Sequence, residues 1–319
     1  MQSLLGLLRD GRFHSGEALG RALGVSRSAV WKQLQILQND LGLEVHRVQG
    51  KGYRLARPLS LLSADLLGAA ELPWPISVHD SLDSTNAQVV RLFGEGQAPP
   101  FAVIAERQTA GRGRRGRPWV SPFAENLYYS LLWQVSGGMR QLEGLSLVVG
   151  LALVHTLHDM GVNAAGLKWP NDVLVDGRKI AGILLELSGD PEDVCQVVIG
   201  VGVNVNMPIA ITREIDQPWI SMRDVLGEPV DRNELAIKFS RHLQGYLQRH
   251  GIQGFSTFVS EWELHHLWQG RQVALSAGAE PIIGMVIGVD SSGALRLMVD
   301  GCERVFSGGE LSLRLHHDS

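Results

Sequence analysis

Apolar positions along the chain change their spacing twice, and each change marks the edge of a predicted domain. In the first sixty residues they recur every three or four places, as in amphipathic helices, before a short alternating stretch. The middle of the chain mixes apolar runs of strand length with a mostly apolar helix at 145–160. A helix is expected near 254–268, and short alternating runs follow it around Val273, Met285, Leu297, Val305 and Leu313. We therefore predict domains at 1–58, 59–269 and 270–319, the last as a small SH3-like β-barrel.

The first domain is predicted to be a winged helix-turn-helix. Ser15 is placed to cap one helix that Gly24 ends, and Ser26 to cap a second helix. The apolar stripe of the second helix leaves its opposite face polar, and residues 45–55 alternate around a Gly-Lys-Gly turn, which predicts a hairpin. The side chains expected at DNA bases are Ser26, Arg27, Ser28 and Lys32, and those expected at phosphates are Lys51 and Arg54.

Charge is divided unevenly between this head and the rest of the chain. The net charge of the 319 residues is −4, but residues 1–57 hold nine Lys/Arg against four Asp/Glu, which gives +5 and leaves −9 elsewhere. Only the head is then suited to a polyanion such as DNA. A winged helix used for protein contacts is the alternative, and the positive balance favours DNA.

Composition narrows the class of protein. Hydrophobic residues at 45% and charged residues at 19% predict a globular chain with real cores. The two cysteines, Cys195 and Cys302, lack metal-ligand spacing and indicate a reducing compartment. No apolar run is long enough for export or for a membrane span, so we expect a cytoplasmic protein without a membrane partner. The pair His265-His266 also lacks metal-ligand spacing and is expected to face solvent.

Residues 111–119, Gly-Arg-Gly-Arg-Arg-Gly-Arg-Pro-Trp, carry the most distinctive pattern of the middle domain. Three glycines free the backbone and four arginines repel one another, so we expect this segment to stay loose until an anion gathers the guanidinium groups. Ordering it costs on the order of ten kcal/mol, against roughly 1.5–3 kcal/mol for each charge-assisted hydrogen bond. A multiply charged ligand such as a nucleotide is therefore predicted, with an arginine-glycine linker or a nucleic-acid patch as alternatives. Strands expected at 103–108 and 126–133 make the segment a lid between two strands of one sheet.

The dipeptide Asp176-Gly177 between apolar runs predicts a tight hairpin. A two-residue turn would pair Leu174 with Lys179 and Asp172 with Ala181, which places Asp172 and Lys179 on one face. In the functional interpretation, Lys179 binds a substrate anion and Asp172 a ribose hydroxyl or a hydrated Mg²⁺. An ordinary surface ion pair, which would contribute little, is the alternative.

Several motifs, in order, closely resemble those of the bacterial biotin-protein ligases. They are Ser84-Thr85-Asn86, Gln108, the lid, and residues 168–172, 178–182 and 200–206. With the winged helix in front, the chain is similar to the bifunctional members that combine a biotin operon repressor with a ligase. The resemblance covers nearly the whole chain. It implies an α+β fold whose central domain, related to class II aminoacyl-tRNA synthetases and lipoate ligases, is a mixed sheet with helices.

The same resemblance assigns roles to residues of the middle domain. It implies that the biotin-binding residues are Ser84, Thr85, Asn86 and Gln108 at the ureido ring and Arg112, Gly113, Arg114 and Lys179 at the acyl-phosphate end. It implies adenylate contacts for Arg117, Trp119 and Asn204. It places Asp172 near the phosphates and Mg²⁺, and makes Arg114, Lys179 and Asp172 the catalytic set. The loop at 207–219 matches less clearly and is assigned no contacts.

The implied activity is an ATP-dependent biotin-protein ligase. Biotin and ATP would form biotinyl-5′-AMP, and the biotinyl group would pass to a lysine of a biotin carboxyl carrier protein. We also expect the adenylate to act as corepressor, completing a homodimer whose two heads bind palindromic operator DNA. Two alternatives stay open: a transcription regulator that senses biotin without catalysis, and a lipoate-type acyl ligase.

Overall fold

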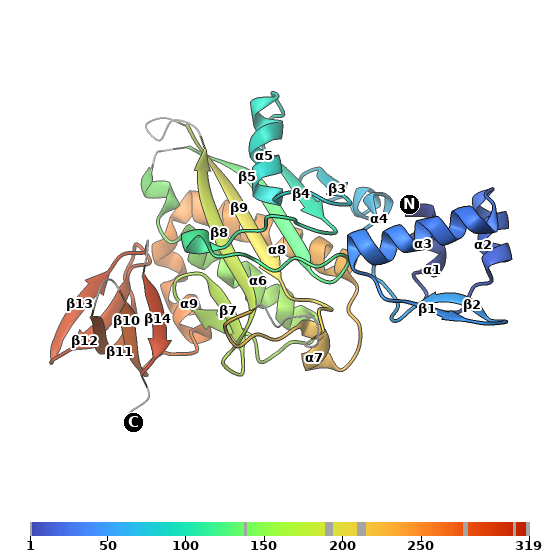
Figure 1. The fold of residues 1–319 in the computed structure, drawn as a ribbon. Helices are drawn as coiled ribbons and strands as arrows, with labels where there is room; N and C mark the ends of the chain where they lie inside the picture. Colours follow the sequence, from blue (N-terminus) through green and yellow to red (C-terminus); the bar gives the residue numbers. More distant parts are fainter. Residues whose placement is uncertain are drawn as a thin grey trace.

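A computed structural model describes residues 2–136, 139–188, 194–208, 215–276, 280–308 and 311–316. Figure 1 shows a helical head at the N-terminal end, a large central part built on a twisted sheet, and a small sheet at the C-terminal end. None of the described helices is both long and apolar enough to cross a lipid bilayer.

The head has the predicted helices and wing. It contains α1 (Gln2–Leu8), α2 (Gly16–Leu23), α3 (Arg27–Leu41), β1 (Val45–Val48) and β2 (Gly52–Leu55). The side chains of Ser15 and Ser26 accept hydrogen bonds from backbone N–H groups in the first turns of α2 and α3, and Gly24 ends α2 in the left-handed conformation, which confirms the predicted helix ends. Strands β1 and β2 pair antiparallel as the wing. Helix α1 was not predicted, and its buried leucines complete the core of the head.

The central sheet has seven strands in the order β3-β4-β5-β9-β8-β7-β6. The strands are β3 (Ile76–His79), β4 (Phe101–Ala105), β5 (Leu127–Ser136), β6 (Gly166–Lys168), β7 (Asp172–Val175), β8 (Arg178–Ser188) and β9 (Val194–Val203). Strands β3 and β4 are parallel and the other neighbours are antiparallel, so the sheet is mixed, as the resemblance implied. The strands on either side of the lid, β4 and β5, are neighbours in the sheet, which confirms the predicted place of the lid.

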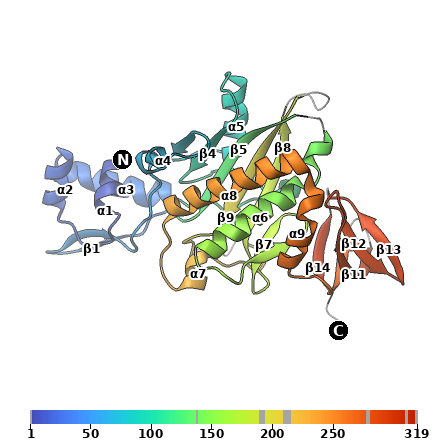
Figure 2. The ribbon, with the colours of Figure 1, turned by 180° about the vertical axis from the view of Figure 1, so that it is seen from behind.

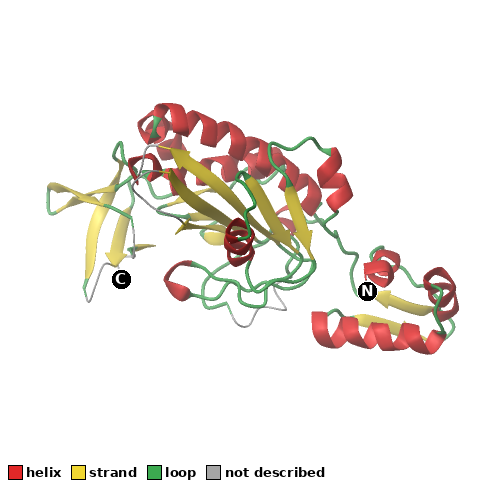
Figure 3. Cartoon of the chain, turned by 90° about the horizontal axis from the view of Figure 1, so that it is seen from above, coloured by secondary structure: helices red, strands yellow, loops and turns green. Residues whose placement is uncertain are grey.

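Helices cover the two faces of this sheet unequally. Helices α6 (Leu145–Asp159) and α8 (Arg232–Gln253) lie side by side on the face seen in Figure 2, where Ala102 and Ile104 of β4 join the main core. On the opposite face, α5 (Thr85–Gly94) packs against Phe101 and Val103 of the same strand. Because successive side chains of a strand point to opposite faces, β4 serves both layers. Figure 3 shows this layering from above.

Shorter helices connect the layers. They are α4 (Ala64–Ala69), α7 (Met222–Leu226), a 3₁₀ turn at Phe255–Phe258 and α9 (Val259–His265). The helix expected near 254–268 is thus a 3₁₀ turn followed by a short α-helix. His266, at the end of α9, is 5% exposed and its ring centroid lies 4.5 Å from that of Trp262. The expectation that it faces solvent was therefore wrong.

The C-terminal part is one antiparallel sheet in the order β13-β12-β11-β10-β14. Its strands are β10 (Gln272–Ser276), β11 (Pro281–Val289), β12 (Leu295–Val299), β13 (Cys302–Phe306) and β14 (Ser312–Leu315). Each predicted strand centre lies in one of them. Because β13 and β14 are its two edges, the described strands form an open sheet and close no barrel. Residues 309–310, between β13 and β14, lie outside the described residues.

The head shares a buried junction with the central part. Phe123 and Ala124, which follow the lid, belong to the same buried cluster as the leucines of the head. Arg57 Nη2 lies 2.6 Å from Glu125 Oε1. Burial raises the pKa of Glu125, and the positive charge of Arg57 opposes that shift. Arg232, fully buried, pairs with Glu106 and donates to the carbonyl of Ser60. The segment that leaves the lid is therefore attached directly to the head.

Candidate functional site

A cavity of about 530 Å³ lies on the α5 face of the central sheet, under the lid. Strands β5, β8 and β9 form its floor, the first turn of α5 lines one end, and the turn between β6 and β7 lines the other. Residues 311–315 of the C-terminal sheet reach its rim. The predicted small-ligand residues that line it are Ser84, Thr85, Asn86, Gln108, Arg112, Gly113, Arg114, Arg117, Trp119, Asp172 and Lys179.

At the end of the cavity near α5, polar side chains hydrogen-bond to one another. Gln108 Oε1 accepts a hydrogen bond from the backbone N–H of Thr85 at 2.8 Å, and its Nε2 donates to Ser121 Oγ at 3.2 Å. Ser130 Oγ lies 2.7 Å from Thr85 Oγ1 and 2.5 Å from Asn86 Oδ1. Ser84 caps α5. Donors and acceptors converge here with little net charge, which suits a small polar ring.

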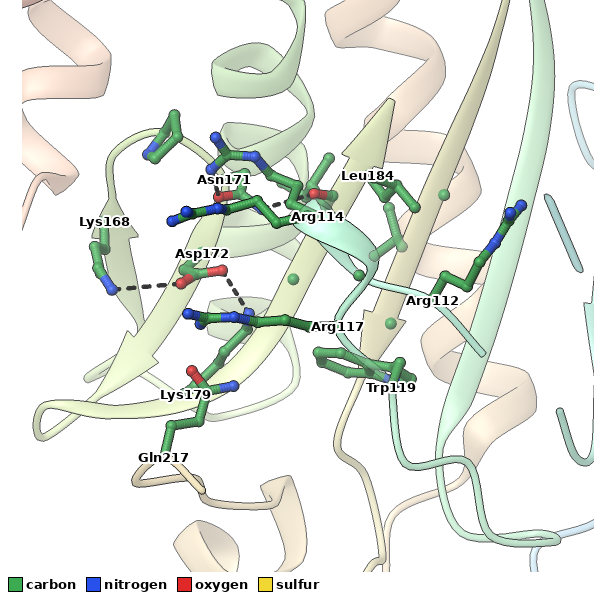
Figure 4. Close-up of a pocket in the computed structure, with 18 of the residues that line it drawn as sticks. Arg112, Arg114, Arg117, Trp119, Lys168, Asn171, Asp172, Lys179, Leu184 and Gln217 are labelled. Carbon is green, nitrogen blue, oxygen red and sulfur yellow. Dashed lines mark hydrogen bonds and ion pairs between the residues drawn. The ribbon is translucent and has the colours of Figure 1, made fainter. Parts of the chain in front are cut away.

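The lid is folded, whereas the sequence predicted a loose segment. The backbone N–H of Gly113 donates to Arg117 O at 2.7 Å and that of Trp119 to Gly111 O at 2.9 Å. The guanidinium groups point in two directions: Arg114 and Arg117 point toward the Asp172 side and Arg112 points away from it (Figure 4). Arg114 Nη1 donates to Asn171 Oδ1 at 2.8 Å, and Arg112 Nη2 lies 3.4 Å from Glu186 Oε1.

Asp172 lies between two lysines at the far end of the cavity. Lys179 Nζ is 2.6 Å from Asp172 Oδ1, and Lys168 Nζ is 3.5 Å from Oδ2 (Figure 4). These side chains are 14–19% exposed, so this is no ordinary surface ion pair. Burial lowers the pKa of Lys168, and the charge of Asp172 opposes that shift. With one carboxylate against two ammonium groups and Arg114 nearby, this end suits an anion.

The predicted register of the β7–β8 hairpin was wrong by one residue. Leu174 pairs with Lys179 as expected, but a bulge then shifts the ladder, so that Asp172 lies opposite Gly182 and not Ala181. The extra residue is Ile180, whose side chain is fully buried. One extra residue on β8 therefore lies between the pair at Lys179 and the pair at Ala181.

The described residues do not fit a magnesium ion held by the protein alone. Magnesium requires several oxygen ligands. The Asp172 carboxylate is already paired with Lys179 and Lys168, and no group of three or more His, Cys, Asp or Glu side chains in the described ranges is placed to hold a metal. The metal role suggested for Asp172 therefore finds no support in this geometry.

Two glycines of β9 let side chains rest on the floor of the cavity. A Cβ atom on Gly200 would lie 2.4 Å from Asn86 Oδ1, and one on Gly202 would lie 2.5 Å from Trp119 Cε2. Glycine is required at both positions because a side chain from α5 and one from the lid pack directly on the strand backbone. Lys179 Nζ also lies 5.3 Å from the ring centroid of Trp119 in the lid, which is a cation–π distance.

Asn204 is the one predicted ligand residue that does not line the cavity. Its Nδ2 donates to the backbone carbonyls of Lys179 and Ile220, so it holds β8 against the segment at 219–220. Ser130 and Glu186 were not predicted from the sequence. Both are polar residues within otherwise apolar strands, and this interruption is the signal that would have indicated them.

The head presents most of its predicted DNA-binding residues to solvent. Ser26, Arg27, Ser28 and Lys32 are exposed at the start of α3, and Lys51 is exposed at the tip of the wing. Arg54 is only partly exposed, and its guanidinium carbon lies 5.0 Å from the ring centroid of Phe13. The helix face and the wing thus offer two separate sets of cations.

Comparison with known proteins decides the family. Residues 78–204 match the biotin/lipoate A/B protein ligase family, and residues 1–54 match an HTH domain family. The bifunctional ligase/repressor BirA of Salmonella typhimurium is 42% identical over 98% of this chain and 97% of its own length, and BirA of Escherichia coli is 42% identical over 98% and 96%. The chain belongs to the bifunctional ligase/repressor family. The solved biotin protein ligase of Aquifex aeolicus in complex with biotin and ATP is 30% identical to this ligase/repressor chain. It covers 76% of the chain and 99% of its own length, with a TM-score of 0.66.

Proposed function

We propose that this ligase/repressor joins biotin to a lysine of a biotin carboxyl carrier protein at the expense of ATP, and that its head represses biotin synthesis genes. One observation carries the proposal: a neutral polar end and a cationic end meet in one cavity under an arginine-rich lid. An acid with a polar ring and a phosphate-bearing nucleotide fit these two ends. The ligase/repressor names of relatives at 42% identity support it.

The residues divide between the parts of the adenylate. The ureido ring is assigned to Ser84, Thr85, Asn86 and Gln108. The acyl phosphate is assigned to Gly113, Arg114 and Lys179, and the AMP portion to Arg117 and Trp119. Arg112, which contacts Glu186, is assigned to the biotin side. Asn204 is assigned an indirect part, through the Lys179 carbonyl to which it donates.

In the first step, a carboxylate oxygen of biotin attacks the α-phosphorus of ATP. The bond from that phosphorus to the bridging oxygen breaks, which yields biotinyl-5′-AMP and pyrophosphate. Negative charge gathers on the transferring oxygens, and Arg114 and Lys179 stabilise it without a protein nucleophile. ATP arrives with Mg²⁺ on its phosphates, since the side chains around Asp172 do not supply a metal site. The lid excludes water from the mixed anhydride.

In the second step, the carrier lysine attacks the acyl carbon, the amide forms and AMP leaves. The amine has a reference pKa of about 10.4 and must lose a proton before it attacks. Asp172 is our candidate acceptor for that proton, because its carboxylate lines the cavity beside Lys179.

The head is assigned to operator DNA. Ser26, Arg27, Ser28 and Lys32 are placed at the bases, and Lys51 and Arg54 at phosphates. Biotinyl-5′-AMP acts as corepressor by completing a homodimer surface that pairs two heads on a palindrome. If the adenylate changed neither sedimentation nor operator affinity, this coupling would be wrong.

Each predicted domain is assigned one part of this function. Residues 1–58 bind DNA, 59–269 perform catalysis, and 270–319 form an SH3-like domain that supports ATP and carrier binding. We place the protein in the cytoplasm, because Cys195 and Cys302 are both free thiols.

Biotin-dependent exchange of labelled pyrophosphate into ATP tests the enzymatic part. We expect exchange with biotin and little with lipoate. Binding of biotin without exchange would leave a sensor that regulates transcription, and stronger exchange with lipoate would identify an acyl ligase of the lipoate type.

The Arg114→Ala variant is expected to release the adenylate at least about tenfold faster, since a charge-assisted hydrogen bond contributes roughly 1.5–3 kcal/mol. Unchanged retention would contradict the role of the lid.

A further inference from the structure

Glu186 of β8 links two parts of the cavity that lie far apart in the sequence. Its Oε2 accepts a hydrogen bond from Asn86 Nδ2 at 2.7 Å, and its Oε1 lies 3.4 Å from Arg112 Nη2. Asn86 belongs to the ring end of the cavity, and Arg112 belongs to the lid. We propose that Glu186 is a positioning residue that fixes the amide of Asn86 and couples occupancy of the ring end to closure of the lid.

Glu186 determines which way the Asn86 amide points. The amide oxygen faces Ser130 Oγ at 2.5 Å, and the amide nitrogen faces the carboxylate. A flipped amide would turn its oxygen toward the negative charge of Glu186, which is unfavourable. Hydrogen bonds to a charged acceptor are about twice as strong as neutral ones. Since Asn86 is 5% exposed and rests on Gly200, a ligand meets an amide with one fixed orientation.

The second carboxylate oxygen of Glu186 pairs with Arg112 and so holds the lid near the ring end of the cavity. Arg112 and Glu186 are 52% and 34% exposed, so their ion pair contributes little to stability by itself. Its effect is geometric: Arg112 is held at β8, while Arg114 is held at Asn171 on the other side. Two arginines thus hold the lid from opposite sides, and the one at β8 shares a carboxylate with Asn86.

This shared carboxylate makes ligand and lid interdependent. A ring that hydrogen-bonds to Asn86 adds to the contacts that already orient that amide, and the carboxylate on which the amide rests also holds Arg112. By linkage, a lid held at Arg112 favours ring binding to the same extent. The inference deepens the proposed function, because the ring in question is the ureido ring of biotin.

Two variants separate the two contacts. Glu186→Ala removes both. Glu186→Gln keeps an amide oxygen for Asn86 Nδ2 but turns an N–H donor toward Arg112, so it breaks only the lid contact. Glu95→Ala, at an exposed position at the end of α5, is the matched control.

The experiment measures biotin affinity by calorimetry and lid opening by tryptic cleavage after Arg112, Arg114 or Arg115, each on the full chain. For Glu186→Ala, we expect biotin affinity to fall at least about tenfold, in line with the loss of a hydrogen bond to a charged group. The lid should be cut several times faster without ligand, and added biotin should no longer protect it. For Glu186→Gln, biotin affinity should stay within about threefold of the native value while cleavage is fast. The control should match the native protein in both measurements.

The outcomes separate this inference from the proposed function. Unchanged biotin affinity and unchanged cleavage in Glu186→Ala would overturn the role of Glu186, whatever the enzyme does. Equal losses for biotin and ATP in both variants, with a lower unfolding temperature, would also overturn it, because they would indicate a structural role. Native biotin binding without pyrophosphate exchange would overturn the catalytic function alone, while the cleavage rates would still test Glu186.

Discussion

The missing side chain at Gly202 decides where the lid rests. An added methyl group would lie 2.5 Å from Trp119 Cε2 and 2.7 Å from its Nε1, so the indole must move off the floor. We predict that Gly202→Ala speeds loss of biotinyl-5′-AMP at least about tenfold, because a displacement of about 1 Å at a catalytic site can cost on the order of a hundredfold. Stability should change little, since Trp119 is only partly buried. Adenylate retention after gel filtration measures the effect.

Gly245→Ala is the control for this prediction. Gly245 lies on α8, and a Cβ atom there would meet nothing within 4 Å. This variant should keep native retention and gain slightly in helix stability. Native retention in Gly202→Ala would show that the tryptophan does not fix the lid.

Single residues of the site were predictable where a motif carries them. Ser84-Thr85-Asn86 and Gln108 were expected together. Thr85 bonds to Gln108 directly and is linked to Asn86 through Ser130, while Ser84 caps the same helix. Glu186 was not expected, because an acidic residue in an apolar strand has no local partner in the sequence. Its partners come from α5 and the lid, and only the folded sheet brings the three together.

At the scale of elements, α9 ends at a buried histidine, His266, which forms a β-bridge with Leu167 of the central sheet. Burial lowers the pKa of His266 to about 4, and the bond to Gln269 only partly opposes this. The unfolded chain, with a histidine pKa of about 6.5, binds more protons, so stability is complete above pH 6.5 and falls as the pH drops toward 4. The loss amounts to on the order of 3 kcal/mol. We predict that in His266→Phe the free energy of unfolding depends less on pH between 6.5 and 4.5. Urea unfolding monitored by tryptophan fluorescence measures this.

His46→Gln, on the wing, is the comparison for that measurement. It should retain the native dependence on pH, because His46 is partly exposed and far from α9 along the chain. If the free energy of unfolding changed equally with pH in the native protein and in His266→Phe, His266 would not be the source of the pH dependence.

Elements were predictable to the extent that their signals are local. Caps at Ser15 and Ser26 gave two helices of the head, and Asp176-Gly177 gave the hairpin. The bulge at Ile180 was not foreseen, because a turn fixes only the pairs next to it and the shift follows the second pair after the turn. Helix α8 was missed although Asp231 caps it and Leu235, Phe239 and Leu243 recur at helical spacing on its buried face.

Across the whole molecule, the lid and the DNA-binding head are joined by a few residues of chain. Trp119 lies on the floor of the cavity, Phe123 lies in the core of the head, and Glu125 binds Arg57 at the end of the head. Only four positions along the chain therefore separate the lid residue Trp119 from Phe123 in the core of the DNA-binding unit. This connection could not be predicted, since no pattern in the sequence indicates that residues 123–124 pack into the hydrophobic core of the head.

Phe123 tests that connection. Removal of a buried phenylalanine costs about 3–5 kcal/mol, and here the loss falls on the head and its attachment. We predict that Phe123→Ala unfolds its head in a separate transition at lower temperature and weakens operator binding at least about tenfold. Biotin-dependent pyrophosphate exchange below that transition should stay within about threefold, because Phe123 does not line the cavity. Phe93→Ala, which alters packing beneath α5, should leave the transition of the head unchanged. A single unfolding transition with native operator affinity would show that the head is stable without this side chain and would contradict the predicted connection.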